Sequence, residues 1–220
     1  VGHALAQRTS RLTRAGDTIL ILAGKGNNGA DARAAGEFLG EHNVILMNVS
    51  EPEAALDEFL HRTGRNDRGT GLNPFADGED PRPALIIDAL FGIGLNRPLD
   101  DAWRKFITAV NESEIPVLAV DAPSGLNVET GGHFGAAIEA TVTLTVGAPK
   151  IGLLAQAAWP FVGRLEVADD VGLSPRQPAS ELNWTLPQDV TGYPPRRAVA
   201  GHKGSFGHVA IVAGSFGFHG

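Results

Sequence analysis

The chain has 220 residues, a formal net charge of −7 and no cysteine. Its length suits one α/β domain with a hydrophobic core, or one domain and part of another. The acidic balance argues against a nucleic-acid-binding protein, which needs clustered Lys and Arg to displace counterions. The lack of cysteine excludes disulfides and thiolate metal sites and is common in a reducing cytosol. Because no apolar run approaches the roughly 20 residues that span a bilayer, we expect a cytoplasmic protein without membrane contact.

Apolar segments alternate with helical ones along most of the chain. Val1, Ala4 and Leu5 have helical spacing at the start. We predict strands, buried on both faces, at residues 18–23, 44–49, 84–90, 117–121, 141–147 and 165–168. We predict helices at residues 31–41, 52–62 and 100–111. This alternation is typical of a parallel sheet that is covered by helices on both faces.

Two segments lack a periodic apolar pattern. Residues 63–83 are rich in Gly, Pro, Asp and Asn, which predicts a surface loop. Residues 172–195 are rich in proline, which predicts a linker after a first domain at residues 1–171. A new apolar strand in "HVAIVAG" indicates the start of a second domain at residues 196–220. The chain begins without methionine and stops just after this strand, so we expect a piece of a longer protein.

The segment "GKGNNG", residues 24–29, matches the spacing G-x-G-x-x-G between a predicted strand and a predicted helix. Glycines there let backbone N–H groups approach a phosphate, and the helix N-terminus adds partial positive charge. Glu51 follows at a distance that suits an acid binding the ribose hydroxyls. Asn27 and Asn28 add side-chain oxygens that can ligate a hard cation or bind a ligand. The alternative is a tight turn that binds nothing.

Polar residues also lie at the ends of three later apolar segments, at residues 84–90, 117–121 and 141–147. Asp88, in "DALFGIGLNRP", is followed by Arg97, and Asp121, in "VDAPSG", is followed by Ser124. Ligands of open α/β sheets bind at the carboxyl ends of strands, where a carboxylate can act as general acid or base. Lys150, in "VGAPKIG", can neutralise a phosphate or help a proton transfer. Each motif alone also fits a turn-forming Asp or a cation exposed to solvent, but their recurrence favours one site.

These four motifs, in this order, resemble the NAD(P)H-hydrate epimerase family, also called the YjeF N-terminal domain, over about residues 1–171. The resemblance implies a three-layer αβα Rossmann-like sandwich with a mainly parallel sheet. The final segment, "HKGSFGHVAIVAGSFGFHG", resembles the opening of the ribokinase-like, ADP- or ATP-dependent NAD(P)H-hydrate dehydratase domain. The two resemblances together imply part of a bifunctional repair enzyme.

The family resemblance also implies a site. Its potassium ligands fall on Asn28, Asp88 and Ser124. Asp121 is the expected proton shuttle and Lys150 the second candidate, in a reaction that inverts C6 of a hydrated nicotinamide ring by loss and re-addition of water. The residues expected to bind the hydrate are Asn27, Asn28, Gly29, Ala30, Asp31, Gly92, Ile93, Gly94, Leu95, Asn96, Arg97, Pro98 and Asp121.

The same resemblance implies a set of cofactors and partners. They are K⁺ for the epimerase domain, ADP or ATP with Mg²⁺ for the dehydratase domain, and NAD(P)HX, the hydrated cofactor, as substrate. We expect a homo-oligomer, because a helical hairpin that precedes this segment in the family contributes to dimerisation. Two alternatives stay open, a Rossmann oxidoreductase that uses intact NAD and a non-catalytic YjeF-like scaffold.

The chain departs from the family pattern at Ala30 and Ala32, where the family has glycine. If Ala30 had to adopt a positive φ, the cost would be about 1 kcal/mol or more. If the family's glycine serves close approach instead, the methyl group of Ala30 would crowd the ligand. Asp31 remains available to cap a helix or bind ribose.

Overall fold

The computed structural model describes residues 1–64, 81–169, 171–172 and 187–193 and positions 185, 201, 204, 208 and 210. The chain divides into two compact units, Val1–Arg176 and Gln177–Gly220. In the second unit the described element is a short 3₁₀ helix, η4 (Pro187–Val190). Residues 65–80 of the predicted loop, most of the predicted linker and most of the strand in "HVAIVAG" lie outside the described residues.

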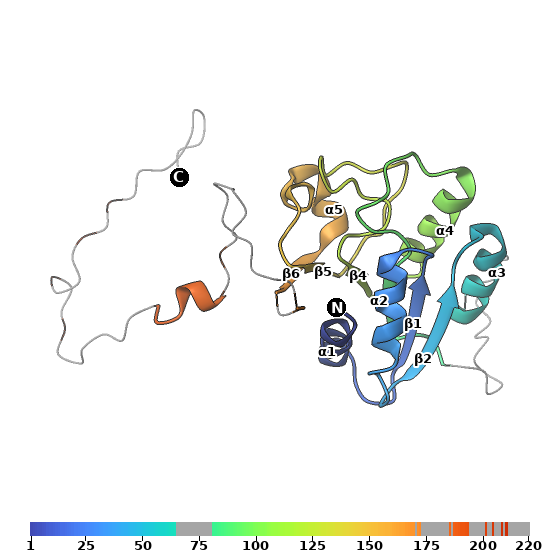
Figure 1. Ribbon diagram of the computed structural model, residues 1–220, viewed down its shortest axis with the longest axis horizontal. Coiled ribbons are helices and arrows are strands. Elements are labelled where there is room, and N and C mark those ends of the chain that lie inside the picture. The colour runs from blue at the N-terminus through green and yellow to red at the C-terminus, as the bar shows by residue number, and fades with distance from the viewer. Residues whose placement is uncertain are drawn as a thin grey trace. The chain divides into compact units, whose positions relative to one another are not determined.

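The first unit is built on one parallel sheet with the strand order β2-β1-β3-β4-β5-β6 (Figure 1). The strands are β1 (Thr18–Ala23), β2 (Asn43–Asn48), β3 (Leu85–Ala89), β4 (Val117–Val120), β5 (Val142–Val146) and β6 (Arg164–Ala168). All five strand pairings are parallel, so every strand ends at the same edge of the sheet. The predicted α/β fold with a parallel sheet is confirmed, and every strand bound falls within one residue of its prediction.

The prediction that all strands are buried on both faces is wrong for the two edge strands. The side chains of β1, β3 and β4 are buried along their whole length, whereas those of β2 and β6 are mostly exposed or half-buried. An edge strand has a neighbour on one side only, so helices cover it incompletely. Its apolar composition alone does not reveal this position.

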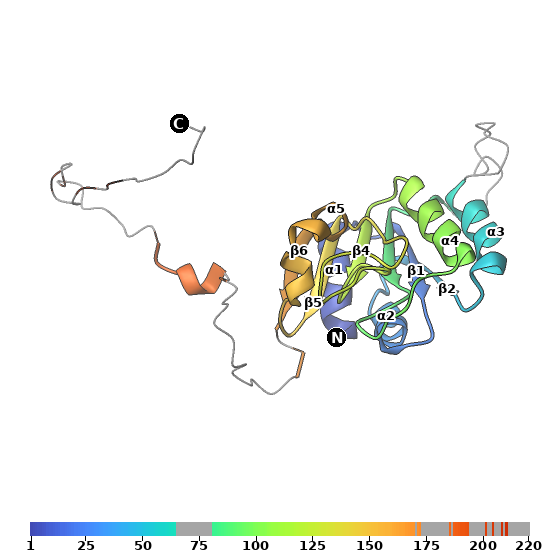
Figure 2. The same cartoon turned by 90° about the horizontal axis from the view of Figure 1, so that it is seen from above.

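Helices cover both faces of the sheet (Figures 1 and 2). On one face α1 (Gly2–Leu12) packs with α2 (Asn27–Gly36), and on the other α3 (Pro52–Thr63) packs with α4 (Asp101–Glu112). After β5 the chain forms the short elements η2 (Ile151–Leu154), η3 (Gln156–Ala158) and α5 (Trp159–Val162). Among the described helices none is long and apolar enough to cross a membrane.

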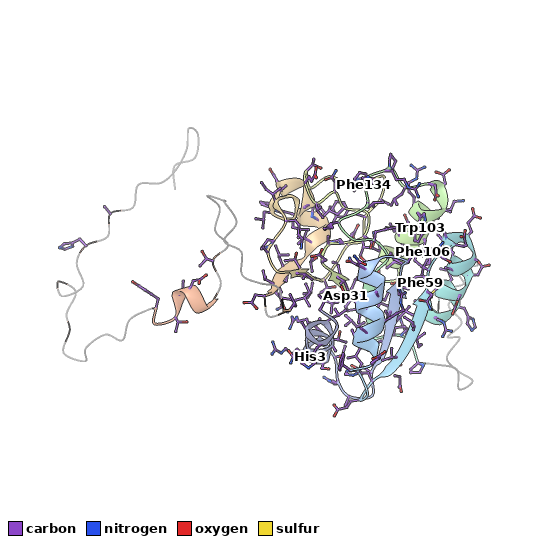
Figure 3. All side chains as sticks on the ribbon, viewed as in Figure 1. His3, Asp31, Phe59, Trp103, Phe106 and Phe134 are labelled. Atoms are coloured by element: carbon purple, nitrogen blue, oxygen red, sulfur yellow. The ribbon has the colours of Figure 1, made fainter. Side chains whose placement is uncertain are left out.

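The alternating side chains of β1 explain why an unbroken apolar run is needed there. Ile19 and Ile21 pack in the core shared with α1 and α2, whereas Leu20 and Leu22 pack in the core shared with α3 and α4. Phe59 of α3 and Phe106 of α4 meet in the second core with ring centroids 5.5 Å apart (Figure 3). Because successive strand residues point to opposite faces, both sets must be apolar when both faces are covered.

Helix α2 begins at Asn27 and ends at Gly36, which corrects the predicted range 31–41. Gly26 is its extended N-cap residue, so the helix starts immediately after the glycine turn and Asp31 does not cap it. Ala30 and Ala32 therefore have helical backbone, and the predicted cost of a positive φ does not arise.

Candidate functional site

A cavity of about 600 Å³ opens at the carboxyl ends of β1 and β3. In the strand order the chain leaves β1 toward β2 on one side and later returns to β3 on the other side. Such a reversal leaves a crevice in which open α/β proteins bind their ligands. The cavity is lined by Gly24, Lys25, Gly26, Asn27, Asn28, Val49, Ser50, Leu90, Phe91, Gly92, Ile93, Gly94, Leu95, Asn96, Arg97 and Trp103.

Three glycines allow the loops around this cavity to touch. A Cβ atom on Gly24 would lie 2.0 Å from the Leu90 carbonyl oxygen, and one on Gly29 would lie 2.0 Å from the Gly24 carbonyl oxygen. A Cβ atom on Gly92 would lie 2.8 Å from Asn28 Oδ1. In contrast, a Cβ atom on Gly26 would meet nothing within 4 Å. The glycine pattern therefore serves close packing of the loop after β1 against α2 and against the loop after β3.

Asp88, the penultimate residue of β3, holds the loops after β3 and β4 together. Its side chain is fully buried. Oδ1 accepts from the Ser124 hydroxyl at 2.6 Å and from Leu90 N at 3.3 Å, and Oδ2 accepts from Ser124 N at 2.8 Å. The Ser124 hydroxyl in turn accepts from Phe91 N at 2.9 Å.

Burial raises the pKa of Asp88 from its ordinary value of 3.8 to about 6, although the hydrogen bonds from Ser124 and Leu90 oppose this shift. No cationic side chain contributes to the shift. The carboxylate therefore lies in a site where its negative charge is poorly compensated.

Asn28 connects the same loops from the first turn of α2. Its Nδ2 donates to the Phe91 carbonyl at 3.1 Å and to the Val120 carbonyl at 2.7 Å. Val120 ends β4 and immediately precedes Asp121. Asn28 thus joins the cavity to the neighbouring strand end.

Asp121 and Lys150 lie together beside the cavity and do not line it. Asp121 Oδ1 accepts from Val146 N at 2.9 Å, from Thr145 Oγ1 at 3.3 Å and from Lys150 Nζ. Within the described chain Oδ2 accepts no hydrogen bond. Asp121 is 8% exposed and has a left-handed backbone with φ of 67°. Because such a conformation costs a residue other than glycine about 1 kcal/mol or more, surrounding contacts must hold the carboxylate in place.

The charges around the cavity favour an anion. Lys25 and Arg97 are its charged lining residues, and no carboxylate lines it. The N-cap residue of α2 is Gly26, which has no side chain to accept hydrogen bonds from the first turn of the helix. The backbone N–H groups of that turn are therefore available to a ligand. A phosphate-bearing ligand would meet complementary charge here.

The cavity includes part of the predicted substrate site. It is lined by Asn27, Asn28 and residues 92–97, but not by Gly29, Ala30, Asp31, Pro98 or Asp121. Gly29 is buried against the first loop, and the other two α2 residues lie farther along the helix. Glu51, considered as a ribose-binding acid, is exposed at the N-cap of α3 and does not line the cavity.

Sequence reasoning missed several lining residues. Val49 and Ser50 follow β2, and Trp103 of α4 also reaches the cavity, with its ring centroid 4.5 Å from that of Phe91. The rule that ligands bind at the carboxyl ends of strands would have indicated Val49 and Ser50. Trp103 shares its helical spacing with the core residues of α4, so the sequence pattern does not distinguish it from them.

The residues expected to hold potassium meet around the Phe91 backbone. Asn28 contacts its carbonyl and Ser124 its N–H group, and Ser124 contacts Asp88. Among the described residues no cluster of three His, Cys, Asp or Glu side chains forms a metal site. One buried carboxylate surrounded by neutral oxygens fits a weakly charged, hard cation, because the cation would compensate the charge that burial leaves.

The comparisons with known proteins identify the family of this chain. Residues 1–152 match the model of the family described as YjeF-related protein N-terminus. The chain belongs to this family. The Rossmann oxidoreductase considered above is therefore set aside, and the glycine loop is that of a YjeF-related domain.

Relatives of this chain are named as NAD(P)H-hydrate epimerases or as a bifunctional NAD(P)H-hydrate repair enzyme. The "NAD(P)H-hydrate epimerase" of Limosilactobacillus fermentum is 37% identical over 77% of this chain and 83% of its own length. The epimerase of Leuconostoc sp. is 38% identical over 78% of this chain and 75% of its own length. The "Bifunctional NAD(P)H-hydrate repair enzyme Nnr" of Coxiella burnetii is 31% identical over 92% of this chain, which spans 42% of that relative.

A solved structure shows the same fold. The crystal structure of yeast ynu0 aligns with a TM-score of 0.51 and 20% identity, covering 76% of this chain and 74% of that chain. This likeness shows that the two chains share a fold.

Replacing Gly24 should test the close packing of the loops. Gly24→Ala places a methyl group against the Leu90 carbonyl, and we expect it to lower the free energy of unfolding by about 2 kcal/mol or more. Gly26→Ala is the matched control, since its surroundings are open, and should cost no more than about 1 kcal/mol. Urea unfolding followed by circular dichroism measures both, and equal losses would contradict this role for Gly24.

The stability of the protein should depend on pH through Asp88. Because its pKa is about 6 when folded and 3.8 when unfolded, the folded state binds more protons between these values. The free energy of unfolding should therefore fall as pH rises from about 4 to about 6, by roughly 2–3 kcal/mol from this group. Unfolding experiments in a potassium-free buffer should show this decrease in the wild type and a weaker one in Asp88→Asn. Identical pH profiles would show that Asp88 is not the group responsible.

Proposed function

We propose that this chain carries the epimerase activity of nicotinamide-cofactor repair, interconverting the R and S forms of NADHX and NADPHX. The observation that carries this proposal is the pair formed by Asp121 and Lys150 at the strand ends beside an anion-binding cavity. Membership of the YjeF-related family and the names of the epimerase relatives support it. A non-catalytic scaffold would not need a carboxylate that is held in a left-handed conformation by three donors.

The cavity suits the phosphates of a dinucleotide. The N-terminus of α2 presents backbone N–H groups, and Arg97 adds a positive charge from the loop after β3. If the pyrophosphate lies between the N-terminus of α2 and Arg97, the nicotinamide ring can extend past Asn28 toward Asp121. Asn28 is hydrogen-bonded to the carbonyl of Val120, the residue before Asp121. Of the predicted hydrate-binding residues, Asn27, Asn28 and residues 92–97 line this cavity.

Asp121 would move the proton in both half-reactions. In its acid form, Oδ2 donates a proton to the C6 hydroxyl, the C6–O bond breaks, and the electron pair of the ring nitrogen forms a planar iminium as water leaves. Water then adds to C6 from the opposite face and returns a proton to Oδ2, so that atoms, protons and electrons balance. Val146 N and Thr145 Oγ1 hold Oδ1, which leaves Oδ2 for the substrate. Lys150 is the second candidate for this proton transfer.

Asn28, Asp88 and Ser124 would hold the potassium ion. The buried charge of Asp88 and the surrounding neutral oxygens provide the ligand chemistry. When bound, the ion supplies positive charge that neutralises Asp88 and steadies the loops after β3 and β4. We expect the whole protein to be a homo-oligomeric cytoplasmic enzyme, as the family resemblance implies.

The parent protein would also carry a dehydratase. The final segment of the present chain resembles the opening of that domain, and the chain spans only 42% of the bifunctional Coxiella burnetii relative. Binding of ADP or ATP with Mg²⁺ would belong to that second domain.

An epimerisation assay should identify the proton shuttle. We expect the folded wild type to equilibrate purified S-NADHX with its R epimer, and Asp121→Asn to be about 10²- to 10⁴-fold slower, because the amide cannot exchange the proton. Chromatography of the two epimers over time measures the rate. Glu129→Gln is the matched control, since this exposed carboxylate lies outside the cavity. Absence of epimerisation in a folded wild type would refute the activity, and equal rates for wild type and Asp121→Asn would refute the role of Asp121.

Potassium should stabilise the protein through Asp88. We expect KCl to raise the melting temperature saturably above that in tetramethylammonium chloride of equal ionic strength, because only the folded state presents the oxygen ligands. Asp88→Asn should abolish this difference, whereas Asp101→Asn, at an exposed position on α4, should keep it. Equal stabilisation of the wild type and Asp88→Asn would exclude a potassium site at this carboxylate.

A further inference from the structure

An arginine of α2 that the reaction above does not use is hydrogen-bonded to the end of β2. Arg33 of α2 donates from Nη1 to the Asn48 side-chain oxygen at 3.0 Å and to the Gly24 carbonyl at 3.1 Å. Asn48 is the last residue of β2, and the two residues after it line the cavity. Within the described part of the chain, Nε and Nη2 of Arg33 donate no hydrogen bond. A guanidinium is thus fixed against Gly24, which lines the cavity, and it still has donors available.

A second cation faces the same region. Lys25 lines the cavity and is exposed, and no ion pair engages it among the described residues. No acidic side chain of the described residues lines the cavity to oppose these two positive charges. Glu51, the nearby candidate, lies at the N-cap of α3 outside the cavity. This end of the cavity therefore favours a ribose that carries a phosphate over a ribose with free hydroxyls.

The direction of a bound dinucleotide follows from the strand order. Asp121 follows β4, and β2 lies three strand spacings away across β3 and β1, which is about 14 Å. If the nicotinamide lies at Asp121 and the pyrophosphate at the start of α2, the adenosine ribose reaches the end of β2. In dinucleotide-binding sheets an acid near this position binds the 2′-hydroxyl of NAD, whereas a basic residue accommodates the 2′-phosphate of NADP. Here the strand ends on a neutral amide paired with an arginine.

We propose that Arg33, assisted by Lys25, binds the 2′-phosphate of NADPHX and sets a preference for NADPHX over NADHX. This inference rests on the proposed epimerase function and on the substrate direction derived from it. Arg33 would direct Nε and Nη2 to the phosphate oxygens while Nη1 keeps its two bonds to the protein. Such charge-assisted, multiply hydrogen-bonded contacts are the usual way in which arginine recognises phosphate.

The preference can be tested by kinetics with both substrates. We expect the wild type to have the higher kcat/KM with NADPHX, and Arg33→Ala with Lys25→Gln to lower the ratio of kcat/KM for NADPHX over NADHX by about tenfold or more. Arg33→Lys should restore part of the ratio. Asn48→Asp should also lower it, because a carboxylate repels the 2′-phosphate, whereas Asn48→Ala should lower it less. Arg11→Ala, which removes an exposed arginine on α1 away from the cavity, is the matched control and should leave the ratio unchanged.

Binding without turnover separates this inference from the proposed function. The folded wild type should bind 2′,5′-ADP more tightly than 5′-AMP in calorimetry, and Arg33→Ala with Lys25→Gln should remove most of this difference. A wild type that fails to epimerise either substrate would refute the proposed function, and this binding comparison would still decide the phosphate subsite. Equal affinities for the two nucleotides, or an unchanged kinetic ratio in the double variant, would overturn the assignment of Arg33 and Lys25.

Discussion

The buried carboxylate of Asp88 is the constraint on which the site depends. It accepts hydrogen bonds from Leu90 in the loop after β3 and from Ser124 in the loop after β4, and it therefore holds the two loops together. These bonds do not fully offset the loss of water, as the raised pKa shows. A charge in this position costs stability, and its retention at the centre of the sheet edge is explained if a cation joins it when the site works.

Asn28 extends this network from the helical layer. Its position in the first turn of α2 places one amide against the carbonyls of two different strand ends, at Phe91 and Val120. Movement of α2 would therefore disturb both the cavity and the backbone that leads to Asp121. The N-terminus of α2, the buried Asp88 and the backbone before Asp121 are thus connected by hydrogen bonds, although they belong to three separate segments of sequence.

The two catalytic candidates occupy a different environment from the cavity itself. Asp121 is oriented by donors of β5 and by Lys150, so its position is set by the strand beyond it and not by the nucleotide loops. The cavity, in contrast, is formed by loops after β1, β2 and β3 that carry the basic residues. Under the proposed function, one part of the sheet edge would bind the substrate and the adjacent part would carry out the chemistry, so specificity for the adenosine end could vary without disturbing proton transfer.

The sequence by itself determined the six strands, the main helices and the motif residues at strand ends, because these depend on periodicity and local backbone chemistry. It also identified the family, since four spaced motifs together are far more specific than one glycine pattern. Only the tertiary structure decided that β2 and β6 are edges, that Asn27 begins a helix and that Trp103 reaches the cavity. It alone paired Asn28 with Val120 and Arg33 with Asn48. The physical reason is that such contacts join residues distant in sequence, and the order of strands in the sheet, which no local pattern specifies, brings them together.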